Sequence, residues 1–371
     1  MLDFFSTGLS ALVWENWVMM GVGIVLIYLG IFKKMEPLLL GPIGFAALLA
    51  NVARTEMGLT DTGGLMEIIY TQLISTGVIP LIIFLGIGTM TDFSPLLANP
   101  KTFFLGAAAQ IGIFCALGLA VFMGFGLSEA ASIGIIGGAD GPTAIYTATR
   151  LVEDQPGIIA AVTVSAYSYM ALVPIIQPPI IKSLTTKKQR QISMGKLRKV
   201  RPIEKILFPI SVTIIVGIIV PFALPLVGML MLGNLFQVSG VMNRLSKSGG
   251  NELINVATIF LGLGIGFLMV GDTFLNLQTI KILLLGIFAF ATATAGGTLL
   301  GQLFYKLSGG KINPMIGAAG VSAVPMASRV VQKIGLKENP RSHLLMHAMG
   351  PNVAGVIGSA TAAGVLIGLL G

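Results

Sequence analysis

The sequence predicts an all-α polytopic membrane protein made of two similar halves, each with one interrupted, re-entrant stretch. Charged residues make up only 10% of the chain and hydrophobic residues 54%, whereas soluble proteins carry about 25% charged residues. Glycine is abundant, at 48 residues, and two of the stretches that contain it also contain proline. Helices are the expected spanning element, because a bilayer leaves backbone polar groups no partner outside their own segment.

The first half, residues 1–181, is expected to contain five spans and one hairpin. The hairpin, 129–149, is too rich in glycine for an ordinary span and holds Asp140 and Pro142. Such a break is allowed at membrane depth only where protein or water surrounds it. Three prolines are expected to break the last span. The predicted spans are 17–32, 38–52, 74–91, 102–126 and 157–181.

Residues 182–205 are expected to form a basic cytoplasmic loop. They carry nine of the 23 Lys and Arg residues and a single acid, Glu204, and positive charge collects on the cytoplasmic side of membrane proteins. No aromatic or base-reading element accompanies this charge, so no nucleic-acid partner is expected. Anionic lipid or an acidic protein partner stays open. Residues 1–16 have no Lys or Arg, which places the N-terminus outside.

The second half, residues 206–371, is predicted to follow the same plan. Its hairpin, 312–331, is again small, glycine-rich and proline-containing, and its last span is interrupted at Gly350, Pro351 and Asn352. Ten spans in total place the C-terminus outside as well. The predicted spans of this half are 206–220, 222–236, 253–271, 281–305 and 342–370.

A shift of 179 residues aligns the two hairpins. TAIYTATRLV (143–152) then lies over SAVPMASRVV (322–331), and Arg150 meets Arg329. Nearby shifts pair FLGIG with FLGLG and LLANV with MLGNL. Five spans per copy would invert the second copy, which is the plan of elevator-type transporters, and interrupted helices in inverted repeats point to a site near the bilayer midplane. Chance similarity between apolar segments is the alternative.

Asp140 is the most informative residue of the chain. A carboxylate in an apolar segment costs a few kcal/mol and usually faces a partner, a cavity or an ion path. The second hairpin lacks this acid but offers Asn313 and Ser322, and the last span offers Asn352. These oxygens suit a hard cation, and one acid favours Na+ over Ca2+. A proton, a helix cap or a pair with an arginine are the alternatives for Asp140.

Other chemistries find little support. Gly309-Gly310-Lys311 is followed by Ile312, so no phosphate-binding loop is formed. His343 and His347 are four residues apart, but no Cys or acid stands beside them. A structural role is therefore expected for these histidines, and no transition metal is expected.

The two hairpin sequences resemble a known family. GGADGPTAIY (137–146) and NPMIGAAGVSAVPMASRVVQ (313–332) are similar to the signatures of the beta subunit of the sodium-pumping, biotin-dependent decarboxylases. These enzymes act on oxaloacetate, methylmalonyl-CoA or glutaconyl-CoA. The resemblance extends from the second span to the C-terminus and includes the spacing of Asn313, Gly317, Ser322 and Arg329.

This resemblance implies a subunit that decarboxylates carboxybiotin and moves Na+ outward across the bacterial inner (cytoplasmic) membrane. The carboxybiotin would be carried on a separate subunit. It implies as partners the biotin carrier subunit, a carboxyltransferase alpha subunit, a small gamma or delta membrane subunit, membrane lipid and further copies of this chain. The acyl substrate would be chosen by another subunit.

The same resemblance assigns roles to residues. Asp140, Arg329 and Ser322 would be catalytic, and the residues that bind Na+ would be Asp140, Asn313, Asn352 and Ser322. Our own inference adds that Arg329 holds the carboxylate of carboxybiotin. Further candidates to line the cavity are Gly317, Tyr167, Tyr169 and Gln177, although Tyr and Gln at such positions also serve as hydrogen-bond partners between helices.

Two other classes of protein compete with the decarboxylase. A Na+-coupled secondary transporter of a di- or tricarboxylate would use the same hairpins, with Arg329 binding the carboxylate of its substrate. A passive channel or structural subunit is disfavoured, because it would not need an acid as costly as Asp140.

Overall fold

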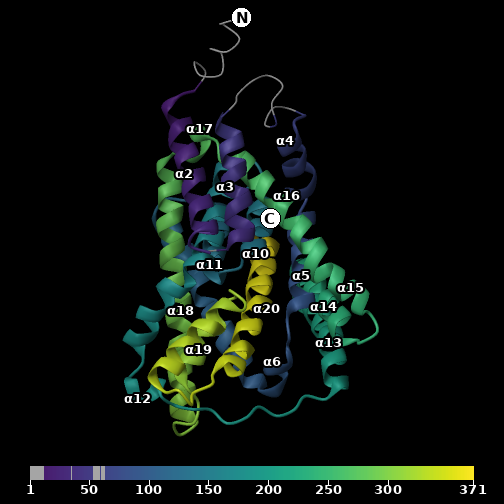
Figure 1. The fold of residues 1–371 in the computed structure, drawn as a ribbon, viewed down its shortest axis with the longest axis vertical. Coiled ribbons are helices and arrows are strands. Elements are labelled where there is room, and N and C mark those ends of the chain that lie inside the picture. The colour runs from purple at the N-terminus through teal and green to yellow at the C-terminus, as the bar shows by residue number, and fades with distance from the viewer. Residues whose placement is uncertain (1–11, 35, 53–58, 60–62) are drawn as a thin grey trace, which may run out of the picture.

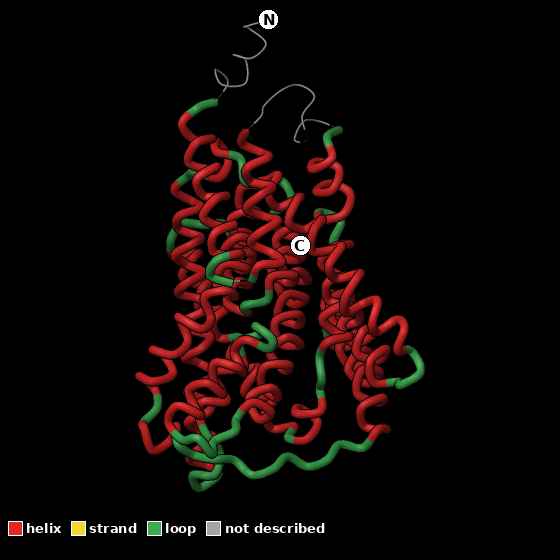
Figure 2. The backbone as a smooth tube through the Cα atoms, viewed as in Figure 1, coloured by secondary structure: helices red, strands yellow, loops and turns green. Residues whose placement is uncertain are grey.

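The computed structural model describes residues 12–34, 36–52, 59 and 63–371. Within these residues every regular element is a helix, as Figures 1 and 2 show. Eight of the described helices are long and apolar enough to cross a membrane. The predicted all-α membrane fold is therefore confirmed.

Each of the ten predicted spans contains a helix. The breaks predicted within 157–181 and at residues 350–352 are wrong, because the helices Pro156–Leu184 and Leu345–Leu370 continue past their prolines. The first half has α2 (Trp14–Ile31), α3 (Pro37–Val52), α4 (Leu65–Ile69) with η1 (Tyr70–Ile74), α5 (Val78–Met90), α7 (Phe103–Ala109), α8 (Ile111–Phe122) and α11 (Pro156–Leu184). The second half has α13 (Pro202–Ile219), α14 (Leu224–Val238), α16 (Ile254–Leu268), α18 (Leu277–Leu307) and α20 (Leu345–Leu370).

Two of these spans differ from straight helices of full length. Helix α3 is an apolar helix of only 16 residues. The predicted span 74–91 is the second part of a bent pair, in which Leu65–Ile74 and Val78–Met90 meet at 66°. The bend lies at Gly77, whose φ of +84° is a left-handed conformation that glycine adopts without strain.

Both predicted hairpins are interrupted helices. The first consists of α9 (Leu127–Gly134), the short 3-10 helix η3 (Ile135–Gly138), a break at 139–140, and α10 (Gly141–Leu151). The second consists of the 3-10 helix η6 (Pro314–Gly320), an extended segment and α19 (Met326–Glu338). All residues of 130–149 and of 313–323 are buried. Protein therefore surrounds both breaks, as irregular backbone at membrane depth requires.

Helix packing divides the described bundle into two groups. One group contains α2, α3, α4, α5, α13, α14 and α16, and the other contains α7, α8, α11, α18, α20 and both hairpins. Each half supplies three spans or bent spans to the first group. The groups touch where α5 meets α10, α16 meets α11 and α14 meets α20.

The contacts between the halves are reciprocal. Helix α3 packs on α16 while α14 packs on α5, and α11 packs on α18 while α20 packs on α7. Asn51 donates to the Met269 carbonyl at the end of α16, at 2.7 Å, and Asn234 donates to the Thr91 carbonyl at the end of α5, at 2.8 Å. These two asparagines lie in the aligned segments LLANV and MLGNL. The inverted repeat stays a prediction, which this pairing supports.

The basic segment lies at one end of the bundle. In Figure 1 it runs along the bottom, at the end opposite to α17 (Gly271–Phe274) and the start of α2. It contains one short helix, α12 (Lys187–Arg190), and an extended stretch that leads to α13. Helix α20 begins at this end and rises through the middle of the view.

Close packing between α5 and α14 depends on glycine, and Gly88 provides a first prediction. A Cβ at Gly88 would lie 2.0 Å from the Leu230 carbonyl oxygen. Gly88→Ala should therefore lower the stability of the chain by about 1–3 kcal/mol, seen as a lower thermal unfolding midpoint in detergent. Gly118→Ala is the matched control, since a Cβ at Gly118 would have no atom within 4 Å. Equal midpoints for the two variants would contradict the packing.

Candidate functional site

Asp140 lies at the break of the first hairpin and is 5% exposed. It is the N-cap of α10, and its Oδ1 accepts a hydrogen bond from the Thr143 backbone N–H at 3.4 Å. Its Oδ2 accepts from the Ser359 hydroxyl of α20 at 2.9 Å. No ion pair joins Asp140 to a Lys or Arg in the described part of the chain. The carboxyl group is thus held by a helix end and a hydroxyl, with no protein cation beside it.

The two hairpins meet directly at this point. The backbone N–H of Ser322 donates to the Gly138 carbonyl at 3.1 Å, and the Ser322 hydroxyl donates to the Ser359 hydroxyl at 3.1 Å. A Cβ at Gly138 would lie 2.9 Å from the Ser359 Cβ, so the close approach needs glycine there. Ser359 therefore links the acid of the first hairpin to the serine of the second.

A cavity of about 280 Å3 opens beside this contact. Asp140 and Ser322 line it from the hairpins. On the side of the other helix group it is lined by Ile87 and Met90 of α5 and by Thr91, which directly follows α5. The remaining walls are mainly apolar and comprise Pro142, Met170, Val324, Pro325, Met349 and Val356. The cavity can hold several waters or a small ligand, and it lies between the two helix groups.

Gln110 offers an additional oxygen near the hairpin contact. Its Nε2 donates to the carbonyls of Gly106 and Gly355, at 3.1 and 3.3 Å, and these two acceptors fix the orientation of the amide. Its Oε1 is buried, has no hydrogen-bond partner among the described residues, and lies 3.6 Å from where a Cβ of Gly138 would be. An unpartnered buried acceptor costs about 1–3 kcal/mol, a cost that a bound cation would relieve.

Asn352 joins α20 to the second hairpin. Its Nδ2 donates to the Val321 carbonyl at 2.7 Å, and its Oδ1 accepts from the Ser328 hydroxyl at 3.3 Å. Val321 precedes Ser322, so the structure brings Asn352 to the part of the second hairpin that meets the first hairpin near Asp140.

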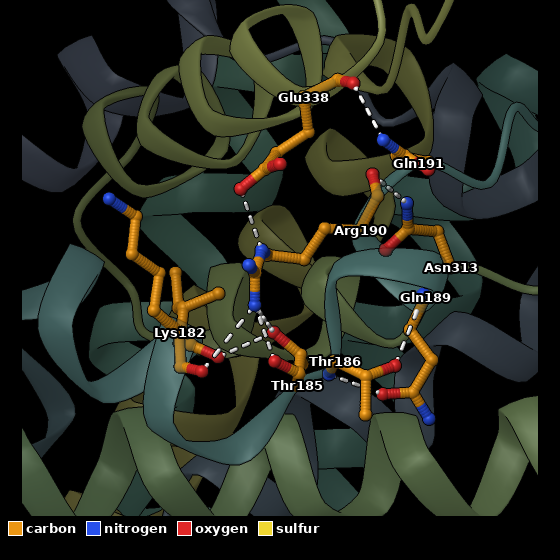
Figure 3. A network of polar contacts seen from close by, with 9 residues as sticks. Lys182, Thr185, Thr186, Gln189, Arg190, Gln191, Asn313 and Glu338 are labelled. Carbon is orange, nitrogen blue, oxygen red and sulfur yellow. Dashed lines mark hydrogen bonds and ion pairs between the residues drawn. The ribbon is translucent and has the colours of Figure 1, made fainter.

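Asn313 has a different set of contacts. Its Nδ2 donates to the carbonyls of Arg190 and Ile192, at 3.2 and 3.0 Å, and its Oδ1 accepts from the Met315 N–H at the start of η6. Figure 3 shows this amide beside Arg190, which also pairs with Glu338 at 3.0 Å. The described hydrogen bonds of Asn313 thus connect hairpin two to the basic segment and do not reach Asp140.

The other predicted residues are not among those that line the cavity beside Asp140. Arg329 is exposed on α19, and its side chain has no hydrogen-bond or ion-pair partner among the described residues. Tyr167 packs its ring against Gly141 and leaves its hydroxyl unpartnered within the described chain. The Tyr169 hydroxyl donates to the Leu283 carbonyl.

Two predicted cavity residues join the second hairpin to neighbouring helices. Gln177 donates to the Ala318 carbonyl of η6 at 3.0 Å, and its Oε1 has no partner in the described chain. Gly317 packs against α18, since a Cβ there would lie 2.0 Å from the Gly297 carbonyl oxygen. Both residues therefore help to seat η6 against its neighbouring helices.

Sequence reasoning missed Ser359 and Gln110. Ser359 lies seven residues after Asn352 in α20, a spacing that places both side chains on one face of a helix. That spacing was an available signal. Gln110 carried no such signal, because a single glutamine in an apolar span is compatible with any contact between helices.

Comparison with known proteins gives a consistent result. A family model described as the Na+-transporting oxaloacetate decarboxylase beta subunit matches residues 15–370. The methylmalonyl-CoA decarboxylase subunit beta of Veillonella parvula is 56% identical, over 98% of this chain and 96% of its own length. The glutaconyl-CoA decarboxylase subunit beta of Acidaminococcus fermentans is 54% identical, over 99% and 96%. A probable oxaloacetate decarboxylase beta chain of Vibrio cholerae is 47% identical, over 97% and 96%.

The contacts of Asn313 predict how the basic segment is held. Asn313→Ala removes both hydrogen bonds to residues 190 and 192, so trypsin should cleave within 182–205 several times faster. Asn276→Ala is the control, because Asn276 likewise caps a helix, through Thr279 N–H at 2.8 Å, but has no described contact with the segment. Cleavage at the wild-type rate in Asn313→Ala would show that this amide does not secure the loop.

Proposed function

This chain belongs to the family of Na+-transporting oxaloacetate decarboxylase beta subunits, and we propose that it decarboxylates carboxybiotin and couples this reaction to outward Na+ transport. The family and its relatives of 47–56% identity support the activity. The observation that supports the location of the site is the buried Asp140, which has one hydroxyl partner, one backbone N–H partner, no described protein cation and an adjoining cavity. These relatives do not favour the carboxylate symporter.

In this proposal Na+ is the transported substrate and binds where the hairpins meet. Asp140 supplies the negative charge, and Ser322, Ser359 and the amide of Asn352 supply neutral oxygens. Such a set of hard oxygen ligands suits a weakly held monovalent cation. Asn313 stays a predicted ligand. Its present hydrogen bonds support a role in holding η6 and the basic segment.

The decarboxylation itself needs an apolar site and a proton. The bond between the ureido nitrogen and the carboxyl carbon breaks, CO2 leaves, and the nitrogen keeps the electron pair and takes up a proton. Apolar walls such as Met170, Val324 and Val356 disfavour the carboxylate and so favour its loss. We propose that Arg329 binds this carboxylate on arrival, since a guanidinium group matches a carboxylate with two parallel hydrogen bonds.

Coupling would follow if Asp140 exchanged its Na+ for the proton that the reaction consumes. Moving one cation outward against roughly 100 mV costs about 2.3 kcal/mol, so the exchange must be tied to decarboxylation. The cavity lies between the two helix groups. A displacement of one group against the other would expose Asp140 first to one side and then to the other, as in transporters with repeated halves.

The chain is a multi-pass membrane protein, and the proposal gives it partners and an orientation. It would work in the bacterial inner membrane with a biotin carrier subunit, a carboxyltransferase alpha subunit, a small gamma or delta subunit and further copies of itself. Na+ and carboxybiotin are then its substrates. Residues 182–205 would face the cytoplasm, and both termini would face outward.

The role of Asp140 is tested by Asp140→Asn in the reconstituted complex. The substitution removes the charge and keeps the shape, so we expect Na+-dependent decarboxylation and 22Na+ transport to fall at least about 100-fold. The control is Asp92→Asn. Asp92 is exposed and accepts a hydrogen bond from the Ser94 backbone N–H at 2.9 Å, so this variant should keep near wild-type rates. Full Na+ dependence in Asp140→Asn would remove this residue from the ion site.

The role of Arg329 is tested by Arg329→Lys, which keeps the charge but loses the planar fork. We expect turnover to fall about tenfold or more, since a bidentate contact is replaced by a point charge. Lys187→Ala, which removes an exposed charge of α12, should leave turnover unchanged. Equal turnover in the two variants would exclude Arg329 from carboxylate binding.

A further inference from the structure

A second cavity, of about 440 Å3, lies at the end of the bundle that carries the basic segment. One wall is the extended stretch Ser193–Leu197, and the other is formed by Arg341 and the start of α20 with His343, Met346 and His347. The Ser193 hydroxyl donates to the Arg341 carbonyl at 3.2 Å, which ties the two walls together. No step of the proposed decarboxylation uses this cavity.

The rim of this cavity carries unpaired positive charge. This charge comes from Lys196 and Arg341, which are exposed, and their side chains form no hydrogen bond or ion pair within the part of the chain that the structure describes. The exposed imidazole of His343 lies on the same rim. No acid lines the cavity. Two acids of this end are paired with other cations: Glu338 with Arg190 at 3.0 Å and Glu204 with Arg198 at 2.8 Å.

The floor of the cavity is apolar. Met194, Leu197 and Met346 line it, and half of the Met346 surface is exposed. His347 contacts the Gly195 backbone, and its Nδ1 is buried with no described partner. An apolar centre with a charged rim is the composition of a protein-binding patch, whereas a small hydrated anion would gain nothing from the methionines.

The position of the cavity indicates which partner would bind there. Helix α20 runs from the cavity into the ion site, and Ser359 follows His347 by twelve residues, which is roughly 18 Å along a helix. Along its length the helix packs on α7, α10, α14 and α19, whereas Leu345 and Met346 in its first turn are exposed and accessible to a partner. A protein docked here would need a long flexible arm to reach Asp140, and a biotinylated lysine is such an arm.

Building on the function proposed above, we propose that this cavity docks an acidic segment of the biotin-carrying subunit. Carboxylates of the carrier would meet Lys196 and Arg341 at the rim, and an apolar side chain would enter between Met194 and Met346. Charge complementarity of this kind raises the rate of encounter and fixes orientation. Docking would thereby aim the carboxybiotin arm along α20.

The test is the double variant Lys196→Glu/Arg341→Glu in the full chain, assayed with the carboxylated carrier. We expect KM for the carrier to rise at least about tenfold and its salt dependence to weaken, with kcat at saturating carrier and 22Na+ binding unchanged. Both side chains are free of described contacts, so folding should be preserved. Free carboxybiotin, which has no carrier, should be used equally well by the variant and the wild type.

The control is Lys187→Glu/Lys188→Glu, which makes the same charge change on α12 at the same end, outside the cavity. Its KM for the carrier should stay within about twofold of wild type, since these two lysines do not line the cavity. Docking is overturned by an unchanged KM in the first variant, by an equal rise in the control, or by an equal rise with free carboxybiotin.

Two further outcomes distinguish carrier docking from lipid binding and from a failure of the ion pump itself. Loss of phosphatidylglycerol binding with an unchanged KM would assign the cations to lipid and overturn docking. A wild-type chain that neither binds 22Na+ nor turns over carboxybiotin would refute the proposed function, whereas a failure of docking alone leaves that function intact.

Discussion

The structure depends on one unfavourable group, the buried carboxyl of Asp140, which has no protein cation beside it among the described residues. A charged Asp140 in the membrane interior costs a few kcal/mol, and its surroundings are arranged to lower that cost. The end of α10 offers a backbone N–H, and Ser359 offers a hydroxyl at 2.9 Å. Gly138 allows the second hairpin to approach until Ser322 joins this group. These neutral groups do not balance the negative charge of Asp140, whereas a bound cation would. This is the physical basis of the proposed ion site.

Glycine residues allow the helices and hairpins around Asp140 to approach closely. Helices without bulky side chains approach until their backbones touch, as at Gly88 with Leu230 and at Gly317 with Gly297. Within each helix group this packing is tight, while a cavity remains between α5 and the hairpins. The ion site thus lies where two well-packed bodies meet. A boundary of that kind can open and close without unfolding either body, and the reciprocal contacts of Asn51 and Asn234 sit inside one body.

Much of the fold was predictable because hydrophobic length and charge placement determine where spans begin and end. The hairpins were predictable because Asp140 and the prolines cannot continue an ordinary lipid-facing helix. The bend at Gly77 was missed, since residues 53–73 carry enough charge to resemble a loop. Of the residues predicted for the site, Asp140 and Ser322 lie close together, both next to Ser359. Asn352 donates a hydrogen bond to the carbonyl of Val321, the residue before Ser322. Asn313 instead contacts the basic segment, more than 100 residues away in sequence, and no local pattern encodes a contact of that range.

The central claim is that the oxygens around Asp140 form a site selective for Na+. It is tested most directly by thermal unfolding of the purified chain in detergent, titrated with NaCl or KCl at constant ionic strength, for wild type and Ser359→Ala. Ligand binding to the folded state raises the unfolding temperature in a saturable way. We expect Na+ to stabilise the wild type at concentrations where K+ does not, and Ser359→Ala to need about tenfold more Na+. Equal stabilisation by the two salts, or identical Na+ curves for the two proteins, would contradict the account.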